Sequence, residues 1–197
     1  ARLVIQGSRD AERGLVETSS PTLARESLRV ILWCILNHHW VIMSGDVPQA
    51  FLRQDPDLWH REVYAFAPEG MPYGIFRLRK AIYGLGDAPY QWYLTIRNWF
   101  LARDFTVSRW DASVFLLYCE MNNPVKGLDG IIGFATDDGI WGGVKRMEKI
   151  MEEFRLQFEL DPWESSRDGP VRFWGHDITQ QESTMTLSQV SYGKALK

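Results

Sequence analysis

The sequence lacks the features of secreted, disulfide-rich and membrane-spanning proteins. Its 197 residues include only two cysteines, Cys34 and Cys119, which lie in unrelated contexts and are expected to be reduced thiols of an intracellular protein. No apolar run approaches the length of a membrane helix, and no signal peptide is visible. Internal repeats and low-complexity tracts are missing as well. We therefore expect a globular protein without a membrane partner.

Positive charge does not exceed negative charge, with 22 Lys and Arg against 25 Asp and Glu. The formal net charge is −3, which argues against a nucleic-acid binder because phosphate contacts usually need a basic surface. With 45% hydrophobic and 13% aromatic residues, the chain can bury a substantial core as one domain or two small ones. The sequence opens inside a predicted strand and stops inside a predicted helix, so we expect a fragment of a longer polypeptide.

Several common catalytic and metal-binding motifs are absent. The sequence contains no Gly-x-Ser-x-Gly elbow and no Walker loop. Cys34, His38 and His39 have the spacing of metal ligands on a helix, but no second pair of ligands accompanies them. A structural zinc site, which needs four ligands, is therefore not expected.

Hydrophobic periodicity predicts a protein of the α+β class, with helices and strands in alternation. We expect helices over residues 21–39, 87–102, 145–158 and from 189 onward. Strands are expected over residues 2–6, 40–46, 62–66, 75–78, 171–178 and 184–188, with two extended pieces in 105–118.

The most informative local pattern is the pair Asp137-Asp138, which separates the apolar runs 131–136 and 139–143. Two short apolar runs joined by two turn-forming residues predict a β-hairpin. Two adjacent carboxylates repel each other, and a divalent cation would offset that cost because hard cations bind carboxylate oxygens. The alternative is an ordinary solvated turn, since Asp is a common turn residue.

A third aspartate, Asp46, ends the predicted strand 40–46. A carboxylate at the point where a strand leaves the core can face a cleft. The alternative is that Asp46 caps a helix ahead of Pro48. A strand-end Asp, an Ala50-Phe51 pair and a distant Asp-Asp hairpin are less expected together by chance than any one of them alone.

With these motifs in this order, the sequence resembles the reverse transcriptase of copia-type LTR retrotransposons. The stretch Gly45 to Leu52 is similar to polymerase motif A, Leu78 to Pro89 with Trp92-Tyr93 resembles motif B, and Ala135 to Asp138 occupies the position of motif C. Further matching stretches are Arg2 to Val4 with Gly7, residues 62–70, residues 173–178 and residues 187–192. The resemblance covers nearly the whole chain and is poor over residues 8–20, 120–130 and 160–170.

This resemblance implies a polymerase palm, an antiparallel sheet with helices packed on one face, together with partial fingers and the start of a thumb. Residues 1–85 would hold the partial fingers and the first palm segment, with motif A at 44–52. Residues 86–180 would form the rest of the palm, with the motif C hairpin at 131–143. Residues 181–197 would begin the thumb or connection.

The resemblance also implies the catalytic residues and the cofactor. Asp46, Asp137 and Asp138 are expected to be catalytic and, with the backbone carbonyl of Val47, to hold two Mg²⁺ ions, with Mn²⁺ as the alternative cation. Asp138 would be the more peripheral ligand. The implied reaction is two-metal nucleotidyl transfer to a primer 3′-hydroxyl by an RNA-directed DNA polymerase. Its partners would be an RNA or DNA template with primer, and dNTPs.

Four more residues are matched to the binding of dNTP or template. Phe51 resembles the steric gate that excludes a ribose 2′-hydroxyl, with an ordinary core Phe as the alternative. Tyr83 and Gly84 match the motif B turn, where a glycine lets the backbone approach the nucleotide or template; the alternative is a loop glycine. Arg2 matches the fingers arginine that contacts the triphosphate.

Departures from the family pattern leave other functions open. Ala135-Thr136 stands where the family usually has Tyr-Val, and Gly86 stands where it often has Lys. The alternative function is a decayed or co-opted, non-catalytic palm-fold module that binds nucleic acid. A nuclease of the integrase type is a third hypothesis, but the glutamate that this class carries downstream of its second Asp is absent.

The resemblance further implies thumb, RNase H and integrase regions elsewhere in the same polyprotein. Its expected location is intracellular, in a cytoplasmic retrotransposon particle, with the nucleus as a second location.

Overall fold

The structure is a computed structural model that describes residues 4–67, 70–120, 123, 125, 127–195. Within these residues it contains four α-helices and three antiparallel sheets, which confirms a mixed helix-and-strand protein. The chain divides into two compact units. Residues 1–20 and 49–96 form the first unit, and residues 21–48 and 97–197 form the second.

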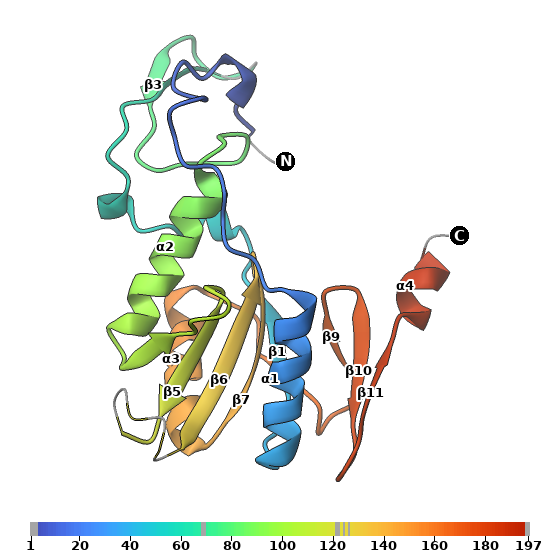
Figure 1. Ribbon diagram of the computed structural model, residues 1–197. Coiled ribbons are helices and arrows are strands. Elements are labelled where there is room, and N and C mark those ends of the chain that lie inside the picture. Colours follow the sequence, from blue (N-terminus) through green and yellow to red (C-terminus); the bar gives the residue numbers. More distant parts are fainter. Residues whose placement is uncertain (1–3, 68–69, 121–122, 124, 126, 196–197) are drawn as a thin grey trace. The chain divides into compact units, whose positions relative to one another are not determined.

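The second unit is built on a six-stranded antiparallel sheet (Figure 1). In spatial order its strands are β4 (Phe105–Val107), β5 (Val114–Tyr118), β6 (Leu128–Ala135), β7 (Asp138–Gly143), β1 (Met43–Asp46) and β8 (Glu164–Ser165). The β6–β7 hairpin therefore forms from the two apolar runs that predict it. Strand β1 ends at Asp46, as expected, and pairs with β7.

Helices cover both faces of this sheet. Consecutive strand residues point to opposite faces. A Cβ atom added to Gly142 would lie 2.7 Å from Ile35 of α1 (Arg25–Asn37), and one added to Gly143 would lie 2.5 Å from Met147 of α3 (Lys145–Gln157). Helices α1 and α3 therefore pack on opposite faces (Figure 1).

The expectation of helices on one face only is thus wrong. The physical reason is the burial pattern of β6, which is buried at every position from residue 130 to 135 rather than at alternate positions. Continuous burial requires cover on both sides of a sheet.

Each face has its own core. The α1 face is aliphatic, and its buried residues include Leu23, Leu28, Ile31, Leu32, Ile35, Ile42, Ile131, Ile140 and Ile178. The α3 face is aromatic and centres on Phe100, from the last turn of α2 (Ala88–Leu101). The ring centroid of Phe100 lies 4.9 Å from that of Phe115 and 5.4 Å from that of Phe154.

A smaller antiparallel sheet completes the second unit. It comprises β9 (Val171–Phe173), β10 (His176–Gln180) and β11 (Met185–Ser188), and α4 (Val190–Ala195) follows. The predicted strand 171–178 is in fact two strands, because Trp174 and Gly175 both have positive φ, 49° and 73°. Two positive φ values in a two-residue loop are typical of the hairpin turn that matches strand twist.

The first unit has a two-stranded sheet, β2 (Tyr64–Phe66) and β3 (Ile75–Arg77), and a small apolar cluster of Trp59, Ala81, Leu85 and Ala88. Three 3₁₀ turns lie at Gly7–Arg9, Ala50–Arg53 and Pro56–Leu58. The expected strand over residues 2–6 is wrong for its described part, residues 4–6. The Ile5 N–H donates to the Tyr83 carbonyl at 2.8 Å, and the Ile5 carbonyl accepts from the Gly7 N–H at 2.9 Å, where the chain turns.

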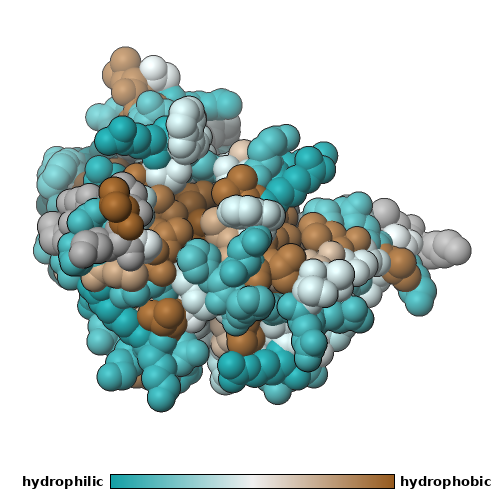
Figure 2. Space-filling model, turned by 60° about the horizontal axis from the view of Figure 1, so that its bottom comes forward, coloured by the Kyte–Doolittle hydropathy of each residue, from teal (hydrophilic) through white to brown (hydrophobic). Residues whose placement is uncertain are grey.

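The surface carries scattered apolar groups. Brown, hydrophobic residues interrupt the polar surface on the face drawn in Figure 2. Cys34 and Cys119 are free thiols. Among the described residues, no helix is both long and apolar enough to cross a membrane.

Candidate active site

Two of the three predicted aspartates face each other across one ladder. Asp46, the last residue of β1, is the register partner of Asp138, the first residue of β7. Directly opposed residues of an antiparallel pair project from the same face. Asp138 shares its face with Gly142, so both aspartates lie on the α1 face of the sheet, at its end. Asp46 is not a helix cap, because it ends a strand.

Asp137 lies in the turn beside this pair. Strand β6 ends at Ala135 and β7 begins at Asp138, so the two turn residues are Thr136 and Asp137. The turn is thus one residue earlier than the Asp-Asp pair suggested. Thr136 adopts φ 63°, a left-handed conformation that favours this tight reversal. The Val47 N–H donates to the Asp137 carbonyl at 3.0 Å, which ties β1 to the turn.

Burial and neighbouring carboxylates raise the pKa values of Asp46 and Asp138. Burial, followed by the charges of Asp46 and Asp137, raises the pKa of Asp138 to about 6. The backbone N–H of Trp174 donates to the Asp138 carboxylate and partly opposes this rise. Partial burial, followed by the charge of Asp137, raises the pKa of Asp46. At neutral pH the site therefore concentrates negative charge.

These residues fit a divalent cation that is shared with a substrate. In the described part of the chain, no Lys or Arg forms an ion pair with Asp46, Asp137 or Asp138. No three His, Cys, Asp or Glu side chains among the described residues form a ready-made metal cage. Mg²⁺ is commonly held by one or two carboxylates together with substrate phosphates, and an opposed pair with an adjacent third carboxylate suits that mode.

A cavity of about 390 Å³ adjoins Asp138, and the sequence does not predict it. Its walls come from the β9–β10 turn and α4. The lining residues are Asp138, Arg172, Phe173, Trp174, Gly175, His176, Asp177, Ser191, Tyr192 and Ala195. A sequence signal for the turn that lines it is Gly175, since Gly is a common turn residue.

The residues matched to nucleotide binding belong to the first unit. Phe51 is half-buried against the apolar cluster, and its ring centroid lies 4.9 Å from that of Tyr83. Gly84 has φ +99°, and a Cβ there would overlap the Ile5 carbonyl. Glycine is therefore required at position 84, because the backbone of Ile5 passes too close to leave room for a side chain. Arg2 lies outside the described residues.

Comparison with known proteins identifies relatives. The chain matches the family described as "Reverse transcriptase (RNA-dependent DNA polymerase)" over residues 1–196. It is 36% identical over 121 residues to the Retrovirus-related Pol polyprotein from transposon RE1 of Arabidopsis thaliana, and 39% identical over 124 residues to that from transposon RE2. Each alignment covers 59% of this chain.

A further relative is the Retrovirus-related Pol polyprotein from transposon TNT 1-94 of Nicotiana tabacum, with 29% identity over 155 residues and 74% of this chain. The chain spans only 8% to 11% of the length of these relatives. No solved structure matches it.

Proposed function

Because the chain belongs to the reverse transcriptase (RNA-dependent DNA polymerase) family, we propose that it is part of an RNA-directed DNA polymerase that adds dNTPs to a primer 3′-hydroxyl by two-metal nucleotidyl transfer. The observation that carries this proposal is the opposition of Asp46 and Asp138 on one rung, with Asp137 in the adjoining turn. Two sequence-distant carboxylates are thereby brought to one end of a buried sheet.

Each of these residues has a definite part in the proposed chemistry. Asp46, Asp137 and Asp138, with the Val47 carbonyl, would hold two Mg²⁺ ions. Bound Mg²⁺ would supply the positive charge that lowers the pKa of the primer hydroxyl and neutralises the departing pyrophosphate. The Trp174 N–H orients the Asp138 carboxylate, and the buried strands hold the carboxylates in place without reorganisation.

The finer division follows the same proposal. Residues 1–85 would hold the partial fingers and the first palm segment, residues 86–180 would form the rest of the palm, and the chain from residue 181 would begin the thumb or connection. Phe51 would select against the ribose 2′-hydroxyl, with Tyr83 and Gly84 close to the dNTP or template. Template with primer, dNTPs and the RNase H and integrase regions of a polyprotein would be the partners, in a cytoplasmic retrotransposon particle.

A non-catalytic module that binds nucleic acid is the second candidate. It is favoured by Ala135, which pairs with Asp138 and is buried, so that no aromatic ring extends from this position towards a primer. The two candidates differ in whether the aspartates act on a substrate or only shape a binding surface.

Primer extension by the full-length parent polyprotein decides between them. Asp137→Asn should reduce Mg²⁺-dependent extension by at least about 100-fold, because a ligand of the catalytic cation is weakened while side-chain shape is kept. Asp168→Asn, at an exposed position, is the matched control and should retain activity. Wild-type rates in the Asp137→Asn enzyme would exclude the metal site. No extension by the wild-type parent would favour the non-catalytic module.

A binding measurement tests the metal site without catalysis. Mg²⁺ should raise the unfolding midpoint of the wild-type chain in proportion to the logarithm of its concentration above Kd. In Asp138→Asn this increase should be reduced. Equal increases of the unfolding midpoint in both proteins would show that Mg²⁺ binds at a site without Asp138.

A further inference from the structure

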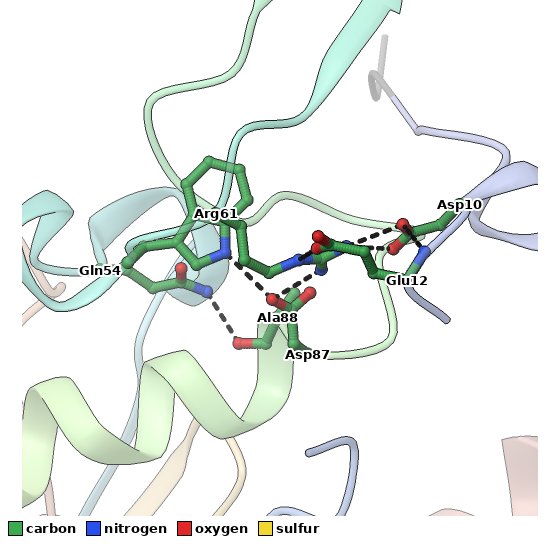
Figure 3. A network of polar contacts seen from close by, with 7 residues as sticks. Asp10, Glu12, Gln54, Arg61, Asp87 and Ala88 are labelled. Carbon is green, nitrogen blue, oxygen red and sulfur yellow. Dashed lines mark hydrogen bonds and ion pairs between the residues drawn. The ribbon is translucent and has the colours of Figure 1, made fainter. Parts of the chain in front are cut away.

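Arg61 occupies the centre of an ion-pair network in the first unit (Figure 3). Its side chain is only 12% exposed and meets three carboxylates. Nη2 lies 2.7 Å from Asp10, Nε 2.7 Å from Glu12 and Nη1 2.9 Å from Asp87. One guanidinium therefore joins the N-terminal segment to the residue that precedes α2. Lysine cannot make these three contacts from one plane.

Asp87 also contacts the indole ring of Trp59. The Asp87 carboxylate is 2% exposed and also accepts a hydrogen bond from Trp59 Nε1 at 3.0 Å. The Trp59 ring belongs to the apolar cluster against which Phe51 packs, and Phe51 in turn contacts Tyr83. A continuous series of contacts therefore links Arg61 to Phe51 and Tyr83, the two aromatic residues that are matched to nucleotide binding.

The same N-terminal segment contacts the Tyr83-Gly84 turn directly. Ile5 N–H donates to the Tyr83 carbonyl. A Cβ on Gly7 would overlap the Gly84 carbonyl, and a Cβ on Gly84 would overlap the Ile5 carbonyl. Residues 5–12 are therefore held to residues 83–87 at two places, by backbone contact at one end and by Arg61 at the other.

From this geometry we infer that Arg61 is a positioning residue for the nucleotide site, which fixes the Tyr83-Gly84 turn and Phe51 and so sets nucleotide KM and sugar selection. The inference rests on the proposed polymerase function. The competing explanation is that the network only stabilises the first unit, as buried ion pairs do when they are complete. The two explanations predict different kinetics.

Hydrogen exchange in this chain tests the connection itself. In Arg61→Lys, exchange of the Trp59 indole N–H and of the Ile5 and Leu85 amides should accelerate about tenfold or more, because charge-assisted hydrogen bonds are lost. Amides of β6 and β7 should not change. The control is Arg77→Lys, whose pair with Glu62 is exposed on both sides, 60% and 63%, and should have no effect. Unchanged exchange in Arg61→Lys would overturn the inference.

Steady-state kinetics of the full-length parent test the consequence. Arg61→Lys should raise KM for dNTP about tenfold, lower kcat less, and increase ribonucleotide use relative to deoxynucleotide, whereas Arg77→Lys should match wild type. Faster exchange with unchanged KM and sugar selection would show a purely structural residue and overturn the inference. If Arg61→Lys does not fold, Asp10→Asn removes one of the three contacts and is measured in the same way.

The two proposals fail separately. An inactive wild-type parent would overturn the polymerase function, and with it the kinetic part of this inference. The hydrogen-exchange result would still show whether Arg61 fixes the Tyr83-Gly84 turn.

Discussion

Asp46 lies directly opposite Asp138 in the β1–β7 ladder, so two like charges share one rung of a buried sheet. Like charges in directly opposed positions destabilise an antiparallel pair. The arrangement is therefore unfavourable for the free protein at neutral pH and favourable for a cation.

The stability of the metal-free chain should depend on pH through Asp138. Its folded-state pKa of about 6 exceeds its ordinary value of 3.8, so the folded state binds more protons between these values. The contribution of Asp138 to the free energy of unfolding is therefore complete below about pH 4 and is lost as pH rises through about 6. Urea unfolding of wild type and Asp138→Asn in EDTA should give a difference that grows over this window. A difference independent of pH would contradict the assignment.

Neutralising Asp138 should also stabilise the metal-free protein at pH 7. The expected gain for Asp138→Asn is about 0.2–1 kcal/mol, the usual size of a cross-strand charge effect. Asp168→Asn, at an exposed position, serves as the control and should lie within about 0.5 kcal/mol of wild type. A loss of stability in Asp138→Asn would show that the hydrogen bond from the Trp174 N–H outweighs the repulsion between the carboxylates.

Phe51→Val should raise ribonucleotide incorporation relative to deoxynucleotide in the full-length parent. The smaller side chain would leave room for a 2′-hydroxyl if Phe51 lies beneath the sugar. Phe51 also packs on the apolar cluster, so thermal stability must be measured in parallel. A lower melting temperature with unchanged sugar discrimination would assign Phe51 to packing alone.

Gly84→Ala should destabilise the chain by about 1–3 kcal/mol. The residue adopts φ +99°, and the new Cβ would overlap the Ile5 carbonyl, so both strain and steric conflict are introduced. Gly14→Ala is the matched control, because nothing lies within 4 Å of its Cβ position. Urea midpoints of the two variants should differ clearly. Equal midpoints would show that the turn relaxes at little cost.

Phe100→Ala should cost about 3–5 kcal/mol, because it opens a cavity among tightly packed rings. Phe100 is fully buried and stacks on Phe115 and Phe154. Trp110→Ala removes a larger ring that is 96% exposed, and should change stability by less than about 0.5 kcal/mol. Similar losses in both variants would contradict the assignment of the aromatic core.

The local spacing of apolar residues predicts much of this fold. The α3 periodicity, with Met147, Met151 and Phe154 buried, and the hairpin of β6 and β7 follow from apolar spacing that is visible in the sequence. Asp46 could be recognised as a strand end because Pro48 follows two residues later, and proline is seldom found inside a strand. Such features depend on residues that are close together in the chain.

Other features could not be predicted, because their partners are far apart. Nothing near Arg61 indicates that Asp10, Glu12 and Asp87 converge on it. Asp87 begins the predicted helix 87–102, yet its carboxylate contacts Trp59 and Arg61, which are distant in the sequence. Helix α1, which covers one face of the sheet at Gly133 and Gly142, is likewise distant from β6 and β7 in the sequence.

Gly142 and Gly143 also affect the position of the Asp138 carboxylate, which lies at the start of the same strand. A slip of β7 by one residue would bring Val144 against Met147 and turn Asp138 from the aliphatic face to the aromatic one. The tight fits of Ile35 on Gly142 and Met147 on Gly143 exclude any side chain at either position, and so oppose that slip. Gly142 and Gly143 therefore help to fix the face of the sheet on which the Asp138 carboxylate lies.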